Sequence, residues 1–115
     1  MGLVSPPPHI IQQIGSAFFS EFFRRLGNAV GPMRGYRITN WYRSPAHNRA
    51  VGGAASSQHQ VATAMDFVFP DRRTYTEAEA RFRAQGFTVF YEGDHLHVQA
   101  MDPVEASRVF PRIRL

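Results

Sequence analysis

Histidines and carboxylates gather in two short stretches of this 115-residue chain, in a combination typical of a metal site. His59 and Asp66 lie at either end of the first stretch, and Asp94-His95-Leu96-His97 forms the second. The chain has no cysteine, so any metal site must use nitrogen and oxygen ligands. Two histidines and one carboxylate leave one position of a zinc ion (Zn²⁺) open, which is the arrangement of catalytic zinc sites. A zinc ion held in this way activates water and polarises a carbonyl group.

The spacing of these residues favours a metal site but leaves simpler interpretations open. His95 and His97 are two apart, so on a strand both side chains point to the same face. Asp66 interrupts an apolar run, where a buried carboxylate is costly unless it is paired or coordinated. Taken singly, His59 could be a surface loop residue, Asp66 could pair with an arginine, and the two later histidines could form a solvated strand face.

Four short strands are expected around these residues, at 36–40, 63–69, 87–91 and 95–100. Alternation in the second strand places Asp66 on the face opposite Met65 and Phe67. The last two strands flank Glu92-Gly93-Asp94, a spacing typical of a hairpin. The pattern therefore predicts a small antiparallel sheet that carries the candidate metal ligands.

Helices are expected at 9–26, 45–50 and 76–85, and for one or two turns after Pro103. The first is expected to end at Gly27, with a loop over 27–35. The second begins at an N-cap, Ser44, and the third at a capping box that opens with Thr76. Together with the strands, these helices predict an α+β fold, a small antiparallel sheet flanked by helices.

Composition and charge exclude several classes of function. All thirteen basic residues are arginine, the net charge is +4, and no run of arginines exceeds two. Because these arginines are scattered, nucleic acid is not expected as a partner. No apolar run approaches the roughly 20 residues that span a bilayer, and the N-terminus lacks the pattern of a signal peptide. We therefore expect no membrane span, and a protein that is cytoplasmic until it is released or carried in a virion.

Residues 36–100 also carry four pieces of a family pattern in the right order. The pieces are Tyr42-Arg43-Ser44, Val51-Gly52-Gly53, the stretch from Ser57-Gln58-His59 to Asp66, and His95-Leu96-His97. Their arrangement resembles the D-Ala-D-Ala carboxypeptidase and L-alanyl-D-glutamate endopeptidase family. Members of this family are zinc peptidases of bacterial cell walls with the hedgehog/DD-peptidase fold, and they include many phage endolysins.

The resemblance implies which residues hold zinc and which perform catalysis. The implied zinc ligands are His59, Asp66 and His97. The family's catalytic acid lies three residues before the last ligand, which points to Asp94, with His95 beside it to polarise the substrate or an intermediate. If His95 were the ligand instead, Glu92 would take the place of Asp94.

The resemblance also implies the substrate and how it is held. Arg43 and Ser57 match positions that hold the carbonyl or carboxylate of the peptide, a task suited to the planar fork of arginine. The implied reaction is hydrolysis of peptide bonds in the stem peptides of peptidoglycan. Ala62 replaces a glycine of the family, which matters if this position takes a positive φ. Trp41 stands where small residues are common and is expected to narrow the cleft.

The expected organisation is a lead and a domain. Residues 1–35 form a proline-rich lead and a phenylalanine-rich helix, either part of the same domain or a docking element, and residues 36–115 form the zinc peptidase-like domain. An alternative function is a structural protein that keeps the peptidase fold. Such a protein would be associated with a virion or another phage or tail-like assembly, with the N-terminal helix as the contact.

Overall fold

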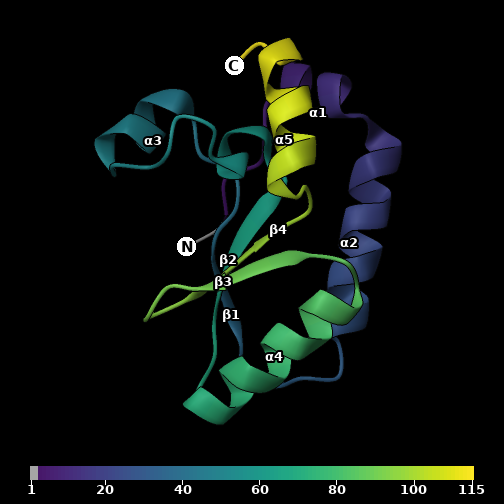
Figure 1. The fold of residues 1–115 in the computed structure, drawn as a ribbon, viewed down its shortest axis with the longest axis vertical. Coiled ribbons are helices and arrows are strands. Elements are labelled where there is room, and N and C mark those ends of the chain that lie inside the picture. The colour runs from purple at the N-terminus through teal and green to yellow at the C-terminus, as the bar shows by residue number, and fades with distance from the viewer. Residues whose placement is uncertain (1–2) are drawn as a thin grey trace.

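Four antiparallel strands form the centre of the molecule in the computed structural model, which describes residues 3–115 (Figure 1). The strands are β1 (Arg37–Asn40), β2 (Ala64–Val68), β3 (Thr88–Tyr91) and β4 (Leu96–Gln99). Their order in the sheet is β1-β2-β4-β3, so β2 and β4 are the two central strands. The expected α+β fold with a small antiparallel sheet is confirmed.

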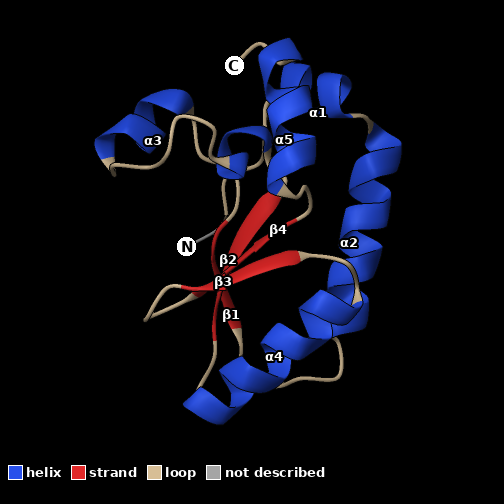
Figure 2. Cartoon of the chain, in the orientation of Figure 1, coloured by secondary structure: helices blue, strands red, loops and turns tan. Residues whose placement is uncertain are grey.

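Five α-helices surround this sheet: α1 (Pro8–Ile14), α2 (Ser16–Val30), α3 (Pro45–Ala50), α4 (Arg72–Ala84) and α5 (Pro103–Val109). Two short 3-10 turns, at Gln58–Val61 and Phe110–Arg112, complete the described elements. Figure 2 shows α1, α3 and α5 gathered at one end of the sheet and α4 at the other. None of the helices within residues 3–115 is long and apolar enough to cross a membrane.

The single helix expected over 9–26 is wrong, because the chain forms two helices there. Gly15 separates α1 from α2 with φ 102°, a conformation that does not continue a right-handed helix. The expected stop at Gly27 is also wrong. The carbonyl of Gly27 accepts a hydrogen bond from the N–H of Gly31 at 2.8 Å, so the helical ladder runs on to Val30.

Helix α4 begins earlier than the capping box at Thr76 predicted. Asp71 is the N-cap, and its Oδ1 accepts hydrogen bonds from the backbone N–H of Thr74 at 2.8 Å and from its hydroxyl at 2.7 Å. The Thr76 hydroxyl lies inside the helix and donates to the Arg72 carbonyl. An aspartate directly after a proline was therefore the stronger start signal.

The hydrophobic core lies between one face of the sheet and the helices α2 and α4. Phe22 of α2, Phe82 of α4 and Phe67 of β2 are all buried, and the Phe67 and Phe82 rings lie 4.9 Å apart. Since successive residues of a strand alternate between faces, burying Met65 and Phe67 in this core turns Asp66 to the opposite face. The core thereby presents the candidate metal ligand to the other side of the sheet.

Candidate active site

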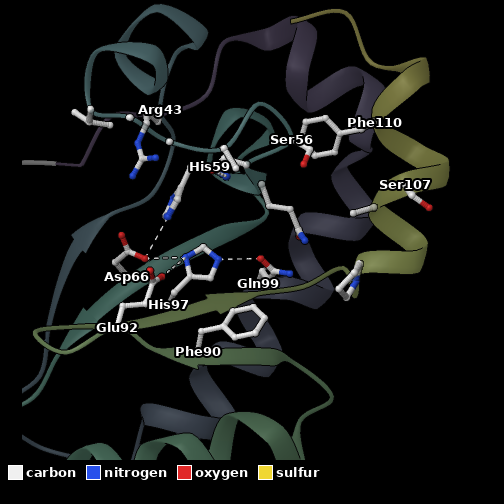
Figure 3. Close-up of a pocket in the computed structure, with 18 of the residues that line it drawn as sticks. Arg43, Ser56, His59, Asp66, Phe90, Glu92, His97, Gln99, Ser107 and Phe110 are labelled. Carbon is white, nitrogen blue, oxygen red and sulfur yellow. Dashed lines mark hydrogen bonds and ion pairs between the residues drawn. The ribbon is translucent and has the colours of Figure 1, made fainter.

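The three predicted zinc ligands lie together on the face of the sheet opposite the core (Figure 3). Asp66 of β2 pairs directly with His97 of β4, and His59 projects from the 3-10 turn that precedes β2. Oδ1 of Asp66 lies 3.0 Å from Nδ1 of His97 and 3.2 Å from Nε2 of His59. Only 2% of His59 and 7% of Asp66 is exposed.

On each imidazole, a hydrogen bond on the side away from Asp66 determines which ring nitrogen carries the proton. Nδ1 of His59 lies 2.7 Å from the Trp41 carbonyl, which can only accept, so Nδ1 carries the proton. Nε2 of His97 lies 2.8 Å from Oε1 of Gln99, whose amide nitrogen donates to the Met101 carbonyl. In their neutral forms both histidines therefore direct a lone pair at the same carboxylate oxygen.

This donor set fits a zinc ion. Two imidazole lone pairs and a carboxylate oxygen repel one another unless a proton or a cation lies between them. The ligand atoms of His59, Asp66 and His97 all lie within 4.8 Å of one another. Ligands about 2.0–2.2 Å from a tetrahedral zinc lie roughly 3.3 Å apart, close to the separations from Asp66. An outward N–H donated to a carbonyl is also the usual support for a zinc-bound histidine.

Without a metal, Asp66 and His97 stabilise each other's charged forms. Burial alone would raise the pKa of Asp66, but hydrogen bonds from His59 and His97 outweigh burial and hold the pKa far below the ordinary 3.8. Burial likewise works to lower the pKa of His97, whereas its hydrogen bonds to Asp66 and Gln99 raise the pKa above the ordinary 6.5. The metal-free site is therefore a buried ion pair.

In the metal-free protein, the Asp66–His97 pair is expected to stabilise the fold within a pH window. The contribution of His97 is complete below pH 6.5 and is lost as the pH rises through the raised pKa. The contribution of Asp66 is complete above pH 3.8 and is lost as the pH falls through the lowered pKa. Zinc requires the unprotonated imidazole, so it should add more stability as the pH rises. The melting temperature with zinc should exceed that with chelator by a margin that grows from about pH 5 to about pH 8.5. A margin that stays constant over this range would contradict the prediction.

The hairpin between β3 and β4 brings a second group of titratable side chains to the site. Oε1 of Glu92 lies 3.6 Å from Nε2 of His95 and 3.9 Å from Nδ1 of His97. Nε2 of His95 also lies 3.9 Å from Oδ2 of Asp66. Glu92 and His95 both line the cleft that opens over the three candidate ligands. A carboxylate and an imidazole therefore stand beside the site, outside the ligand set.

Asp94 lies on the far side of His95. Its Oδ1 is 2.6 Å from Nδ1 of His95, and its side chain is 89% exposed and does not line the cleft. The hydrogen bond from His95 lowers the pKa of Asp94. Tyr75 of α4 donates its hydroxyl to the Asp94 carbonyl at 3.0 Å and holds this turn against the fold. Asp94 thus orients His95, whose other nitrogen faces Glu92.

The turn that carries His59 is held by both predicted substrate-binding residues. The Ser57 hydroxyl accepts a hydrogen bond from the His59 N–H at 3.3 Å, and the Arg43 N–H donates to the His59 carbonyl at 2.9 Å. Both residues also line the cleft. They therefore position the candidate ligand as well as facing the space where a substrate would lie.

In the guanidinium of Arg43, one nitrogen is hydrogen-bonded within the chain and another has no partner. Its Nη1 donates to Oδ1 of buried Asn48 at 2.9 Å, and Asn48 in turn donates to the Ala54 carbonyl. A Cβ on Gly53 would lie 2.0 Å from that Asn48 oxygen, so only glycine fits there. The buried Nε of Arg43 has no hydrogen-bond partner within residues 3–115. A buried donor without a partner is costly, and its burial also keeps this nitrogen out of reach of a ligand. Arg43 nevertheless lines the cleft, so the rest of its side chain faces the space above the candidate ligands.

Ala62 adopts the positive φ that the family's glycine suggested, with φ 61° and ψ 21°. It is fully buried, and its carbonyl accepts a hydrogen bond from the Trp41 indole at 2.7 Å. The left-handed conformation starts the chain into β2 directly after the turn that carries His59. Alanine is therefore accommodated without displacing the candidate ligands.

Replacing Ala62 by glycine is expected to change the free energy of unfolding by less than about 1 kcal/mol. Relief of left-handed strain gains roughly 1–2 kcal/mol. Loss of a buried methyl, about 0.8 kcal/mol, and the greater entropy of unfolded glycine, about 0.5–1 kcal/mol, oppose it. Ala62→Val should instead destabilise by more than about 2 kcal/mol, since it adds a branched side chain to a filled, strained position. Urea unfolding measures both, and a gain above about 2 kcal/mol for glycine would show that strain dominates.

Trp41 does not narrow the cleft, contrary to expectation. Its indole lies against α2, where the ring packs 5.5 Å from Phe23 in a smaller apolar pocket of about 430 Å³. The hydrogen bond from the indole to Ala62 turns the ring away from the candidate ligands. Trp41 serves the site through its backbone carbonyl, which holds His59.

Sequence reasoning missed Gln99 and Asn48. Gln99 is two residues after His97, so strand alternation alone places both side chains on one face and could have revealed it. Asn48 and the Trp41 carbonyl gave no local signal, because both reach their partners through tertiary packing.

Comparison with known proteins agrees with this site. The family model described as peptidase M15 matches residues 13–101, a range that includes His59, Asp66 and His97. No curated protein and no solved structure gives a match. The matched range contains α2, the whole sheet and the candidate ligands. The family resemblance seen in the sequence is therefore confirmed. The chain belongs to the peptidase M15 family.

Proposed function

We propose that this protein is a zinc-dependent peptidase that hydrolyses peptide bonds in the stem peptides of peptidoglycan. The observation that carries the proposal is the convergence of His59, Asp66 and His97 beneath an open cleft of about 1210 Å³, with Glu92 beside them. A protein that only kept the fold for a structural role would have no need of this complete set. The family supports a peptidase, and the donor set supports zinc.

The residues that would hold zinc are His59 through Nε2, His97 through Nδ1, and Asp66 through its carboxylate. When bound, zinc supplies a Lewis acid that activates water and polarises the scissile carbonyl. Trp41 and Gln99 keep the two imidazoles in the required tautomer by accepting their outward N–H groups.

Glu92 is the general base in this proposal. Its carboxylate reaches within 3.9 Å of His97 and lines the cleft, so it can take a proton from the attacking water and pass it to the leaving amine. His95 stands next to Glu92 with Nδ1 held by Asp94, which directs Nε2 toward the reacting groups. Asp94 acts through His95, as a positioning residue.

Arg43 supplies the substrate anchor. Its guanidinium is fixed by Asn48, and its buried Nε lacks an acceptor in the described chain. Because Arg43 lines the cleft, a carbonyl or carboxylate of the peptide can accept a hydrogen bond from the accessible part of its guanidinium, which would hold the substrate on one side of the scissile bond. Ser57 also lines the cleft.

The function is tested with purified peptidoglycan. Protein loaded with one equivalent of zinc should release peptides from walls, and mass spectrometry of the products should show new termini within the stem peptides. Loss of release with chelator and recovery with zinc would support the proposal. A folded, zinc-loaded protein that cleaves neither walls nor synthetic stem peptides would overturn it.

A further inference from the structure

The cleft over the candidate metal centre has two sides of different chemistry. Arg43 and Glu92 lie on one side of the ligands, and Phe90 and Phe110 lie on the other (Figure 3). The second side, which we call the apolar arm, consists of Phe90, Pro103, Ala106, Phe110 and Pro111, and the uncharged polar side chains of Ser56, Gln99 and Ser107 border it. The charged side chains that line the cleft within residues 3–115 are Arg43, Asp66, Glu92 and the histidines, and none belongs to this arm.

The apolar arm begins at a candidate zinc ligand. Phe90 of β3 pairs with His97 of β4, and the two rings stack with centroids 6.2 Å apart and planes at 28°. Phe90 is nevertheless 48% exposed, because its outer face looks into the cleft. Exposed apolar surface that is continuous with a reactive centre is typical of a binding site.

The opposite wall of the arm is part of the rigid framework. Ala106 and Phe110 pack against the small core of Ile10, Val61 and Met101. Met101 also exchanges two hydrogen bonds with the Gln58 side chain, at 2.6 and 3.0 Å, which ties the start of α5 to the turn of His59.

A second contact secures the chain after α5. The Gln13 side chain of α1 exchanges two hydrogen bonds with the backbone of Arg114, at 2.8 and 3.1 Å. Residues 103–111 lie outside the range that the family model matches, which ends at residue 101.

We propose that the apolar arm is a specificity subsite that binds an uncharged, apolar residue of the peptide next to the scissile bond. Such a side chain removes the exposed faces of Phe90 and Ala106 from water, whereas a charged one loses hydration and meets no opposite charge. With the proposed peptidoglycan substrate, an alanine satisfies this subsite, and a glutamate or a diamino acid does not. The proposal rests on the proposed function, because the subsite binds the residue on one side of the bond that the proposed peptidase would cleave.

The test uses the stem peptide that the zinc-loaded protein cleaves, synthesised with alanine, leucine, lysine or glutamate at each position that flanks the scissile bond. At one flanking position, lysine and glutamate should lower kcat/KM by about ten-fold or more relative to alanine. The Ala106→Glu variant should recover cleavage of the lysine peptide. Phe90→Arg, which changes an exposed side chain on the other wall, should recover cleavage of the glutamate peptide.

Val104→Glu is the matched control. It adds the same charge to the same helix, but Val104 is 60% exposed and does not line the cleft. The control should leave the ranking of peptides unchanged. The proposal would be overturned if the protein cleaved peptides with charged residues as well as the alanine peptide at every flanking position. It would also be overturned if Ala106→Glu and Phe90→Arg both ranked the peptides as the wild type does.

A binding measurement separates this proposal from the function itself. In metal-free protein with ¹³C-labelled alanine methyl groups, tri-alanine should shift the Ala106 signal and tri-glutamate should not. If no peptide is ever cleaved but this selective shift occurs, the subsite stands and the peptidase function falls. If peptides are cleaved without a selective shift or charge discrimination, the function stands and the subsite falls.

Discussion

Replacing His59 by alanine is expected to weaken zinc binding and peptide hydrolysis together. His59 offers one of three convergent ligand atoms and is almost fully buried, so no solvent-exposed side chain can take its place. Structural zinc sites bind with roughly 10–16 kcal/mol over four ligands, so losing one ligand should weaken zinc binding on the order of 10²–10³-fold. Metal content after dialysis and release of peptides from walls measure the two effects.

The same change should destabilise the metal-free protein. His59 is almost fully buried and its ring donates to the Trp41 carbonyl, so its removal leaves that acceptor without its partner, which costs about 1–3 kcal/mol. His47→Ala is the control, since His47 lies exposed on α3 and outside the cleft. A His59→Ala protein that retains one equivalent of zinc and full activity would contradict the assignment of this ligand.

Glu92→Gln is expected to lower kcat by about 10²–10⁴-fold while zinc stays bound, because general bases contribute this range. The amide keeps the shape of the side chain but cannot accept the proton. Asp94→Asn should lower kcat by only about ten-fold, since Asp94 reaches the reaction through the orientation of His95. Kinetics at saturating substrate and zinc content of each variant provide the measurements.

These two variants also decide which carboxylate is the general base, a choice between Asp94 and Glu92 that the sequence left open. If Asp94→Asn removes activity and Glu92→Gln keeps it, the base is Asp94, as the family spacing implies. Such a result would require the exposed Asp94 side chain to turn into the cleft when substrate binds. The opposite result assigns the base to Glu92, in the position that it already occupies.

The errors in the predicted fold have a common physical origin. The helix pattern over 9–26 continued smoothly through Gly15, yet this glycine takes a positive φ that lets α1 turn away and pack with α5. At Gly27 the reverse occurred, because packing of α2 on the core outweighs the weak intrinsic preference of one glycine. Local signals mark where a helix can end, and tertiary packing decides whether it does.

The sequence by itself determined the candidate ligand set and the faces of the strands. Residue type, the two-residue period of β2 and β4, and the family spacing were sufficient to select His59, Asp66 and His97, because these signals are local or shared within the family. The position of Glu92 and Asp94 was decided only by the tertiary structure. Both lie in one hairpin turn, where a side chain's direction depends on the turn and on contacts such as Tyr75.

Only the tertiary structure showed which groups hydrogen-bond to the candidate ligands and which helix forms the far wall of the cleft. The carbonyl that holds His59 comes from Trp41, and α5, which closes the apolar arm, packs on α1 from the other end of the chain. Such contacts join residues far apart in sequence through backbone groups and apolar surfaces that have no motif. A candidate zinc site could therefore be predicted from the chain, whereas the shape of the cleft above it required the fold.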